Sequence, residues 1–255
     1  MALPPITRRK RGWMNLKVTK VIHETHDTDT FVMEDQEDGG RVFDYHSGQY
    51  LTFRFDDVAD KPVVRSYTMS SSPNQGDFSA FTVKRVEGGL ISNWLCDNVK
   101  EGTILRGRGP IGKFCYDPDD ADHLFMVAGG SGVTPFVSIM RDHAEKLGQP
   151  GSPKRMTLLV SYRTKQDLIL WEDLEAINAV EGCNVITTLS REDAQADGFW
   201  HGRIDEPMLA KAIDGEYSGT TYMTCGPIPM MDMMVEHCKK NGVAEEFIKL
   251  ESFES

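Results

Sequence analysis

The stretch LFMVAGGSGVTP, residues 124–135, is a short apolar run that ends in a glycine-rich turn. Residues 124–128 predict a buried strand, and Pro135 suits the first turn of a following helix, where a missing N–H costs nothing. Such a turn can bring backbone N–H groups close to a phosphate, but it is equally typical of a plain tight connection. The stretch therefore predicts a strand–turn–helix unit and leaves the ligand of the turn open.

The same alternation of strand and helix continues downstream of this turn. The expected strands are residues 124–128, 156–161, 184–189 and 220–224, and the expected helices follow Thr134, Leu170, Ile204 and Gly226. Strands that alternate with helices favour a parallel sheet with helices on its faces. We therefore expect an α/β domain over residues 119–255.

Upstream of residue 118 the pattern is that of short strands. Runs rich in β-branched and aromatic residues, divided by Gly, Asp and Pro, cover residues 16–21, 30–34, 49–55, 63–69, 78–86 and 103–108. This pattern predicts a small antiparallel β-barrel over residues 1–118. One helix is expected at residues 90–95, with Leu90, Ile91, Trp94 and Leu95 along one apolar face. The acidic, turn-rich residues 117–122 mark the expected domain junction.

The composition is that of an ordinary globular protein, with 40% hydrophobic and 26% charged residues among 255. No run approaches the roughly 18 apolar residues of a membrane span, and the polar, basic start does not resemble a signal peptide, so we expect a cytoplasmic protein. The net charge of −11 argues against nucleic acid as a partner. It arises wholly after residue 118, so any phosphate bound there needs local arginines and backbone N–H groups. The basic run at residues 8–11 is interpreted as a solvated tail.

Eight short motifs occur in a characteristic order along nearly the whole chain. They are Arg65-x-Tyr67-Thr68, Val83-Lys84-Arg85, Gly88-Gly89-x-x-Ser92, Gly109-Pro110-x-Gly112-x-Phe114, Gly129-Gly130-x-Gly132-x-Thr134-Pro135, Gly202-Arg203-Ile204, Cys225-Gly226-Pro227 and Glu251-x-Phe253. In these motifs the chain resembles the ferredoxin–NADP(+) reductase superfamily. It is most similar to the bacterial oxygenase reductase components, including the phenylacetyl-CoA epoxidase reductase type. The resemblance implies an NAD(P)H-dependent flavoprotein reductase.

The resemblance implies that the barrel binds FAD. In the family pattern Arg65 pairs with the flavin diphosphate, Tyr67 lies against the isoalloxazine ring, and Thr68 is close to the reacting part of that ring. The expected flavin contacts are Arg65, Ser66, Tyr67, Thr68, Val83, Lys84, Gly88, Gly89 and Ser92. Each motif also has a plain structural interpretation: a surface ion pair for Arg65, a half-buried strand aromatic for Tyr67, and a solvated strand lysine for Lys84.

The resemblance likewise implies a nicotinamide nucleotide site on the α/β domain. Its expected contacts are Gly129, Gly130, Gly132, Thr134, Pro135, Arg163, Ser190, Arg191, Cys225, Gly226 and Pro227. By the family pattern Thr134 and Cys225 lie at the hydride-transfer site, although a buried inert thiol is the plain interpretation of Cys225. The candidate catalytic residues are Thr68, Thr134, Cys225 and Glu251. They are expected to align and polarise the reacting groups rather than act as acid or base.

The choice between NADPH and NADH depends on the ribose 2′-phosphate. Arg163 follows one expected strand, and Ser190-Arg191 follows the next, in the manner of the Ser-Arg pair that holds this phosphate in plant-type reductases. We therefore expect NADPH, with NADH as the alternative if both arginines are solvated or contact only the adenine.

The expected reaction carries electrons from NAD(P)H through FAD to a one-electron acceptor, a [2Fe–2S] centre that serves an oxygenase. The five cysteines form no cluster-binding motif, so we expect no metal in this chain and read them as reduced thiols. The acceptor is then a separate iron–sulfur protein or a C-terminal ferredoxin domain beyond Ser255. Two alternatives remain open, a flavin reductase that releases reduced flavin and a non-catalytic flavin redox-sensing module.

Overall fold

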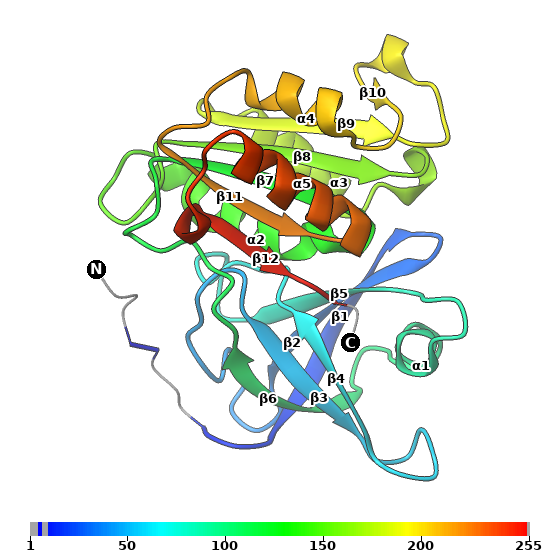
Figure 1. Ribbon diagram of the computed structural model, residues 1–255. Helices are drawn as coiled ribbons and strands as arrows, with labels where there is room; N and C mark the ends of the chain where they lie inside the picture. The colour runs from blue at the N-terminus through cyan, green and yellow to red at the C-terminus, as the bar shows by residue number, and fades with distance from the viewer. Residues whose placement is uncertain (1–4, 7–9, 254–255) are drawn as a thin grey trace.

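The computed structural model describes residues 5–6 and 10–253 and divides them between two sheets (Figure 1). Residues 8 and 9 of the predicted basic tail, residues 8–11, fall outside the described residues. In Figure 1 the antiparallel sheet forms the lower body and the parallel sheet with its helices the upper one. In the part of the chain that the structure describes, no helix is both long and apolar enough to cross a membrane.

The lower body is a six-stranded antiparallel sheet that curls into a barrel, as the sequence predicts. Its strands are β1 (Met14–Thr25), β2 (Thr28–Asp35), β3 (Tyr50–Phe55), β4 (Val63–Thr68), β5 (Ser79–Lys84) and β6 (Ile104–Ile111). They follow the spatial order β4-β3-β6-β1-β2-β5, and an isolated bridge between Met69 and Phe81 joins the two outer strands. This bridge closes the barrel at the end that faces the α/β domain.

Alternating side chains fill the barrel. On β3 the buried positions are Leu51, Phe53 and Phe55, and the ring of Phe53 lies 4.6 Å from that of Phe81. Helix α1 (Leu90–Asn98) covers this core with Ile91 and Leu95. The predicted apolar face of α1 is wrong in one residue, since Leu90 is 50% exposed at the first turn. Its side chain points away from the stripe that the other apolar residues share.

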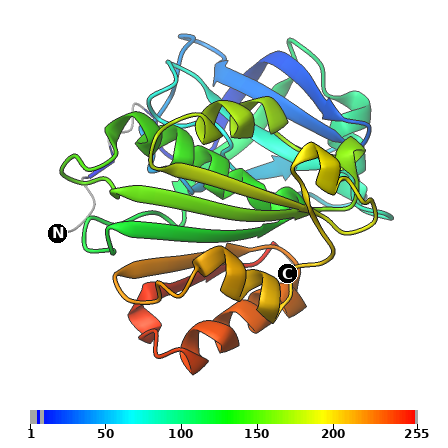
Figure 2. The same ribbon diagram turned by 90° about the horizontal axis from the view of Figure 1, so that it is seen from above.

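The upper body is a six-stranded parallel sheet, also as predicted. Its strands are β7 (His123–Gly129), β8 (Arg155–Tyr162), β9 (Cys183–Leu189), β10 (Trp200–His201), β11 (Thr220–Cys225) and β12 (Ile248–Glu251), in the order β10-β9-β8-β7-β11-β12. The helices are α2 (Thr134–His143), α3 (Trp171–Asn178), α4 (Glu206–Ile213) and α5 (Ile228–Lys240). Figure 2 shows α2 and α3 on one face of the sheet, with α4 and α5 on the other. The sequence analysis did not predict the two shortest strands, β10 and β12.

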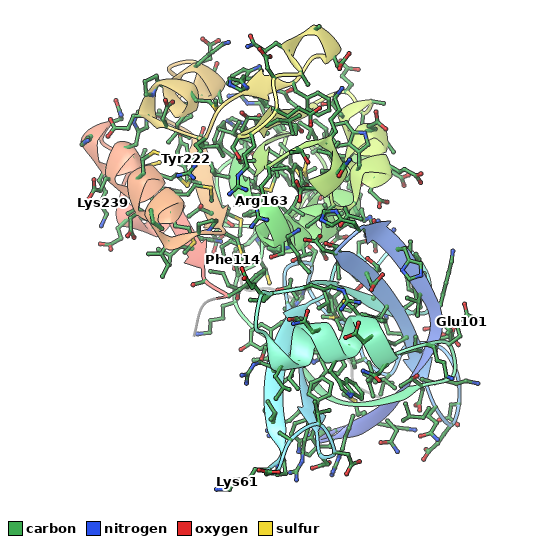
Figure 3. All side chains as sticks on the ribbon, turned by 90° about the vertical axis from the view of Figure 1, so that its right-hand side faces the viewer. Lys61, Glu101, Phe114, Arg163, Tyr222 and Lys239 are labelled. Atoms are coloured by element: carbon green, nitrogen blue, oxygen red, sulfur yellow. The ribbon has the colours of Figure 1, made fainter. Side chains whose placement is uncertain are left out.

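Helix α2 lies against the barrel. Its Ser138 donates a hydrogen bond to the carbonyl of Ser71 at 2.6 Å, and its Arg141 donates to the carbonyl of Ser70 at the same distance. Phe114, which lies at the junction in Figure 3, packs at a tilt against Phe136 of α2 with ring centres 5.7 Å apart. These contacts join the end of β4 to the amino-terminal half of the α/β domain.

Candidate functional site

The barrel has an open seam between β4 and β5. β4 pairs along its length with β3, and β5 pairs with β2, so their facing edges meet only at the Met69–Phe81 bridge and the residues just after it. Helix α1 lies across this seam, because the Cys96 thiol is 3.8 Å from the Val83 carbonyl and Trp94 packs with Tyr67 against the barrel core. The seam leaves unpaired backbone groups beside the predicted flavin motif.

The side chains of β4 lie along this seam. Arg65 is exposed and donates only to the neighbouring Val64 carbonyl, at 2.7 Å, with no acidic partner among the described residues. The ring of Tyr67 is half-buried, 5.4 Å from that of Phe81, and burial raises the pKa of its hydroxyl. Thr68 is buried at the inner end of the strand, while Ser66 is exposed. A free guanidinium and a neutral aromatic face fit a diphosphate and a flat ring.

The turn before α1 offers a second set of donors. Gly88 has φ of +69°, and Gly89 caps the helix without a side-chain hydrogen bond, so the first backbone N–H groups of α1 have no capping side chain. A Cβ atom on Gly89 would lie 2.7 Å from the Ser92 hydroxyl. That hydroxyl accepts from the N–H of Val86 at 3.2 Å, so Ser92 shapes the turn. The arrangement fits an anion at the start of the helix.

Two predicted flavin contacts on β5 have other surroundings. Val83 is fully buried in the barrel core, so its side chain is not available and only its backbone faces the seam. Lys84 donates to both carboxylate oxygens of Asp27, at 2.7 and 2.6 Å. The structure thus does not bring the Lys84 ammonium together with Arg65 and Tyr67.

In the α/β domain the two predicted turns are in direct contact. The turn that follows β7 packs on the turn that follows β11: a Cβ on Gly132 would overlap the Cys225 carbonyl, and one on Gly226 would lie 2.8 Å from the N–H nitrogen of Gly129. Glycine is therefore needed here for backbone approach, in addition to any ligand. Thr134, the first residue of α2, is buried and donates to the Ser131 carbonyl at 3.0 Å.

The other residues of these turns lie at their surface. Gly130 takes the left-handed conformation with φ of +53°, and a Cβ there would meet nothing within 4 Å. Pro227 is exposed directly before α5, while Pro135 is buried in the first turn of α2. The carboxyl ends of β7 and β11 therefore form one continuous surface, which is where open α/β sheets bind ligands.

Cys225 and Glu251 lie side by side at the ends of β11 and β12. The strands are parallel and place the two residues in register. Cys225 is fully buried, and burial raises the pKa of its thiol. Burial also raises the pKa of Glu251 to about 7, and its Oε2 is buried without a hydrogen-bond partner among the described residues. A carboxyl group in this state can hold or release a proton near neutral pH.

Two exposed arginines lie together at the neighbouring carboxyl edge. The backbone N–H of Arg191 donates to the Arg163 carbonyl at 2.8 Å, and that of Ser190 donates to Tyr162 at 2.9 Å. Neither guanidinium forms an ion pair within the described ranges, and Figure 3 shows Arg163 on the α/β domain above Phe114. Two unpaired cations in an acidic domain suit a phosphate group.

Sequence reasoning passed over Arg203, which the structure adds to this edge. Gly202 donates its N–H to the carbonyl of Leu189 at 2.9 Å, so the residue after it follows β10 just as Arg191 follows β9. Arg203 is exposed like Arg163 and Arg191. The Gly202-Arg203-Ile204 motif was visible, but β10 has only two residues and gives no strand signal of its own.

Family models and solved structures agree with this geometry. Residues 15–116 match the model of the oxidoreductase FAD-binding domain, and residues 126–236 match that of the oxidoreductase NAD-binding domain. The FAD/NAD-binding domain of a nitric oxide dioxygenase from Vibrio cholerae is similar in structure, with a TM-score of 0.82 and 25% sequence identity over 94% of this chain and 98% of that one.

Two curated relatives cover almost all of this chain. The glycine betaine monooxygenase reductase subunit of Chromohalobacter salexigens is 31% identical over 98% of the chain and 67% of the relative. The ferredoxin reductase component of 3-ketosteroid-9-alpha-monooxygenase from Rhodococcus rhodochrous is 32% identical over 94% of the chain and 65% of the relative. The chain thus spans about two thirds of the length of these relatives. It belongs to the ferredoxin–NADP(+) reductase superfamily of FAD- and NAD-binding oxidoreductases, among relatives that are reductase components of oxygenases.

Proposed function

We propose that this chain passes electrons from NADPH through FAD to an iron–sulfur acceptor that serves an oxygenase. The observation that carries the proposal is the contact between the Gly129–Gly132 and Cys225–Pro227 turns, with the half-buried Glu251 beside them. This contact forms one ligand-binding edge on the α/β domain, next to a barrel whose open seam carries a free arginine and an aromatic face.

The residues along the seam hold and orient the flavin. Bound FAD supplies the chemistry of accepting a hydride from a nicotinamide and giving up electrons singly. Arg65 and the first turn of α1 bind the diphosphate, since both offer N–H donors without competing carboxylates. Tyr67 would hold the ring against the barrel, and its hydroxyl is uncharged at neutral pH. Thr68 contributes its hydroxyl at the buried end of the same strand.

The residues of the α/β edge orient the nicotinamide and exclude water from it. Thr134 and Cys225 are buried at the two packed turns, where they would support the backbone against which the nicotinamide lies. Burial raises the pKa of Glu251 to about 7, so its carboxyl can hold or release a proton near neutral pH. These three side chains align and polarise the nicotinamide, and none of them is required as a nucleophile.

The arginines at the ends of β8 and β9 support NADPH over NADH. Arg163 and Arg191 stand together and unpaired, within a half of the chain that carries all of the net negative charge. A 2′-phosphate would relieve the repulsion between them. NADH remains the alternative nucleotide, since the family model requires only a nicotinamide dinucleotide.

The electron acceptor is proposed from the relatives. Their names describe reductase components of monooxygenases, and about one third of their own length lies outside the part that this chain covers. An iron–sulfur centre, either in a separate protein or in that additional length, suits a flavin that gives up single electrons. Such a reductase works in the cytoplasm, where NADPH is available.

A spectrum of the purified protein tests the proposed function. The protein should be yellow, bleach on addition of NADPH without air, and keep its flavin through gel filtration. Flavin lost on the column would instead indicate an enzyme that releases reduced flavin. A yellow protein that neither nucleotide bleaches would indicate a redox-sensing module.

The variant Cys225→Ser tests the nicotinamide side separately. It should slow flavin reduction by NADPH in stopped-flow measurements while leaving the flavin content unchanged and the protein folded. The matched control is Cys238→Ser, a buried thiol on α5 in the other core of the same domain. Equal reduction rates in Cys225→Ser and the parent protein would make Cys225 merely structural.

A further inference from the structure

Lys84 lies between carboxylates that belong to the two domains. Its ammonium contacts Asp27, in the turn between β1 and β2, at 2.6 Å, and lies 3.8 Å from Asp167, in the connection between β8 and α3. All three side chains are largely buried, with 18%, 18% and 10% of their surface exposed. In Figure 1 the β1–β2 hairpin rises from the barrel toward the α/β domain at this place. A barrel cation thus bridges the domains on the side of β5 and α3.

Asp167 also fixes the local chain. Its Oδ2 accepts from the backbone N–H of Thr164 at 3.0 Å and from the Thr164 hydroxyl at 2.8 Å, in a reciprocal capping arrangement. Thr164 directly follows Arg163, so the carboxylate that faces Lys84 holds the backbone next to this arginine. The position of β5 is therefore linked to that of Arg163 through two side chains.

The turn of the hairpin reinforces this link. His26 Nδ1 lies 3.4 Å from the Gln166 carbonyl, and the side chains of His26, Asp27 and Asp167 are within 4.8 Å of one another. Such a group could bind a metal ion, but the Lys84 ammonium already satisfies both oxygens of Asp27. A partly buried ion pair with this geometry is short, charge-assisted and little screened by salt.

We propose that Lys84 is a positioning residue: through Asp27 and Asp167 it ties the flavin-binding barrel to the segment that carries Arg163. This inference rests on the proposed function, in which Arg163 contacts the nucleotide. Without the tie, the segment at residues 163–167 samples more conformations, and NADPH must order it on binding. The cost appears in KM for the nucleotide, while flavin binding is untouched.

The experiment compares Lys84→Met, Asp27→Asn and the double variant with Lys84→Arg, which keeps the charge. Three quantities are measured on the FAD-loaded protein: KM and kcat for NADPH, flavin retention, and hydrogen–deuterium exchange of residues 163–168 without nucleotide. Lys100→Met is the matched control, because this exposed lysine follows α1 and has no ion pair among the described residues. The exchange measurement does not depend on turnover.

We expect Lys84→Met and Asp27→Asn each to raise KM by roughly three- to tenfold with kcat nearly unchanged. The double variant should be no worse than Lys84→Met, because Lys84→Met already removes the contacts with both Asp27 and Asp167. Hydrogen–deuterium exchange at residues 163–168 should be faster in the two single variants and the double variant. Lys84→Arg should keep both the exchange and the KM close to those of the parent. Flavin retention should match that of the parent.

Several outcomes would overturn the proposal. Loss of flavin in Lys84→Met would make Lys84 a cofactor ligand, as the sequence motif first indicated. A raised KM in Lys84→Met with parental exchange at residues 163–168 would indicate direct contact of Lys84 with the nucleotide. Unchanged exchange in both variants would also exclude the tie. If the parent does not oxidise NADPH, the proposed function fails, and the exchange result still decides the role of Lys84.

Discussion

The two glycine turns of this protein have the same sequence signature but serve different physical needs. At Gly88, in the barrel, a Cβ would meet nothing within 4 Å. At Gly132, in the α/β domain, the space is already filled by the backbone of the turn after β11. A glycine in such a turn can therefore be required by the fold before any ligand binds, as at Gly132, whereas Gly88 has open space around it.

The largest expected effect tests this difference directly. Gly132→Ala places a methyl group onto the Cys225 carbonyl, which is backbone and cannot move cheaply. We expect a loss of about 4–5 kcal/mol in the free energy of unfolding, or failure to fold. Gly88→Ala, at φ of +69° in open space, should cost only about 1–2 kcal/mol. Urea unfolding of both variants measures these two losses in the free energy of unfolding. Equal losses would show that the two glycines do not differ in this way.

The second prediction concerns arginines of the α/β domain that should affect nucleotide binding but not stability. Replacing both Arg163 and Arg191 by Ala should shift the ratio of kcat/KM for NADPH over NADH by at least about a hundredfold, since each charge-assisted contact is worth roughly 1.5–3 kcal/mol. Stability should be unchanged, because both side chains are exposed and unpaired among the described residues. Added salt should weaken NADPH more than NADH. Equal loss with both nucleotides would mean that the arginines bind their shared part.

The corresponding barrel prediction concerns Arg65. Arg65→Ala should weaken FAD binding by about ten- to a hundredfold, or roughly 1.5–3 kcal/mol, because it removes a charge-assisted contact with the diphosphate. Flavin retention on dilution measures this effect. Lys61→Ala, which removes a positive charge at the far end of the barrel in Figure 3, is the control. If both variants keep their flavin equally well, Arg65 is not part of the site.

The smallest effect is a pH dependence at Glu251. Burial raises the pKa of Glu251 in the folded protein to about 7, above its ordinary value of 4.5. As pH rises, the unfolded chain loses this proton at a lower pH than the folded protein does. The stability that the proton contributes therefore falls as pH rises from about 4.5 through 7. The free energy of unfolding of Glu251→Gln, taken relative to that of the parent, should therefore be about 1–2 kcal/mol higher at pH 8 than at pH 5.

Thermal unfolding at both pH values measures this difference between Glu251→Gln and the parent. Glu246→Gln, at an exposed position on the preceding turn, should show no such dependence. A Glu251→Gln variant that follows the parent at both pH values would show that this carboxyl is ionised in the folded protein at neutral pH.

Much of the fold follows from local pattern, and the exceptions have physical reasons. The alternation of β3 and the apolar run of β7 predict their strands, because burial on one or both faces fixes those periods. β10 and β12 have two and four residues, too few for any period, and depend on pairing with β9 and β11. The prediction for Leu90 fails because its side chain lies off the buried stripe of α1, whereas Ile91 in the same turn reaches the core.

The site shows the same limit. The motifs predict which residues belong to it, but a motif does not contain the partner that a side chain meets across the fold. Lys84 meets Asp27, 57 residues away, and Gly132 meets the carbonyl of Cys225. Neither contact has a signature in the local sequence. Arg203 was missed for a related reason, since it depends on the pairing of β10.

β12 has a consequence for how the protein is made. All barrel strands lie before residue 112, so the barrel can close while the α/β half is still being synthesised. β12 completes the parallel sheet, and its Lys249 contacts Asp120 and the Cys115 carbonyl in the connection between the domains. These two contacts therefore form only after β12 has left the ribosome, and we expect the nascent chain to carry a folded flavin domain before it has a nicotinamide site.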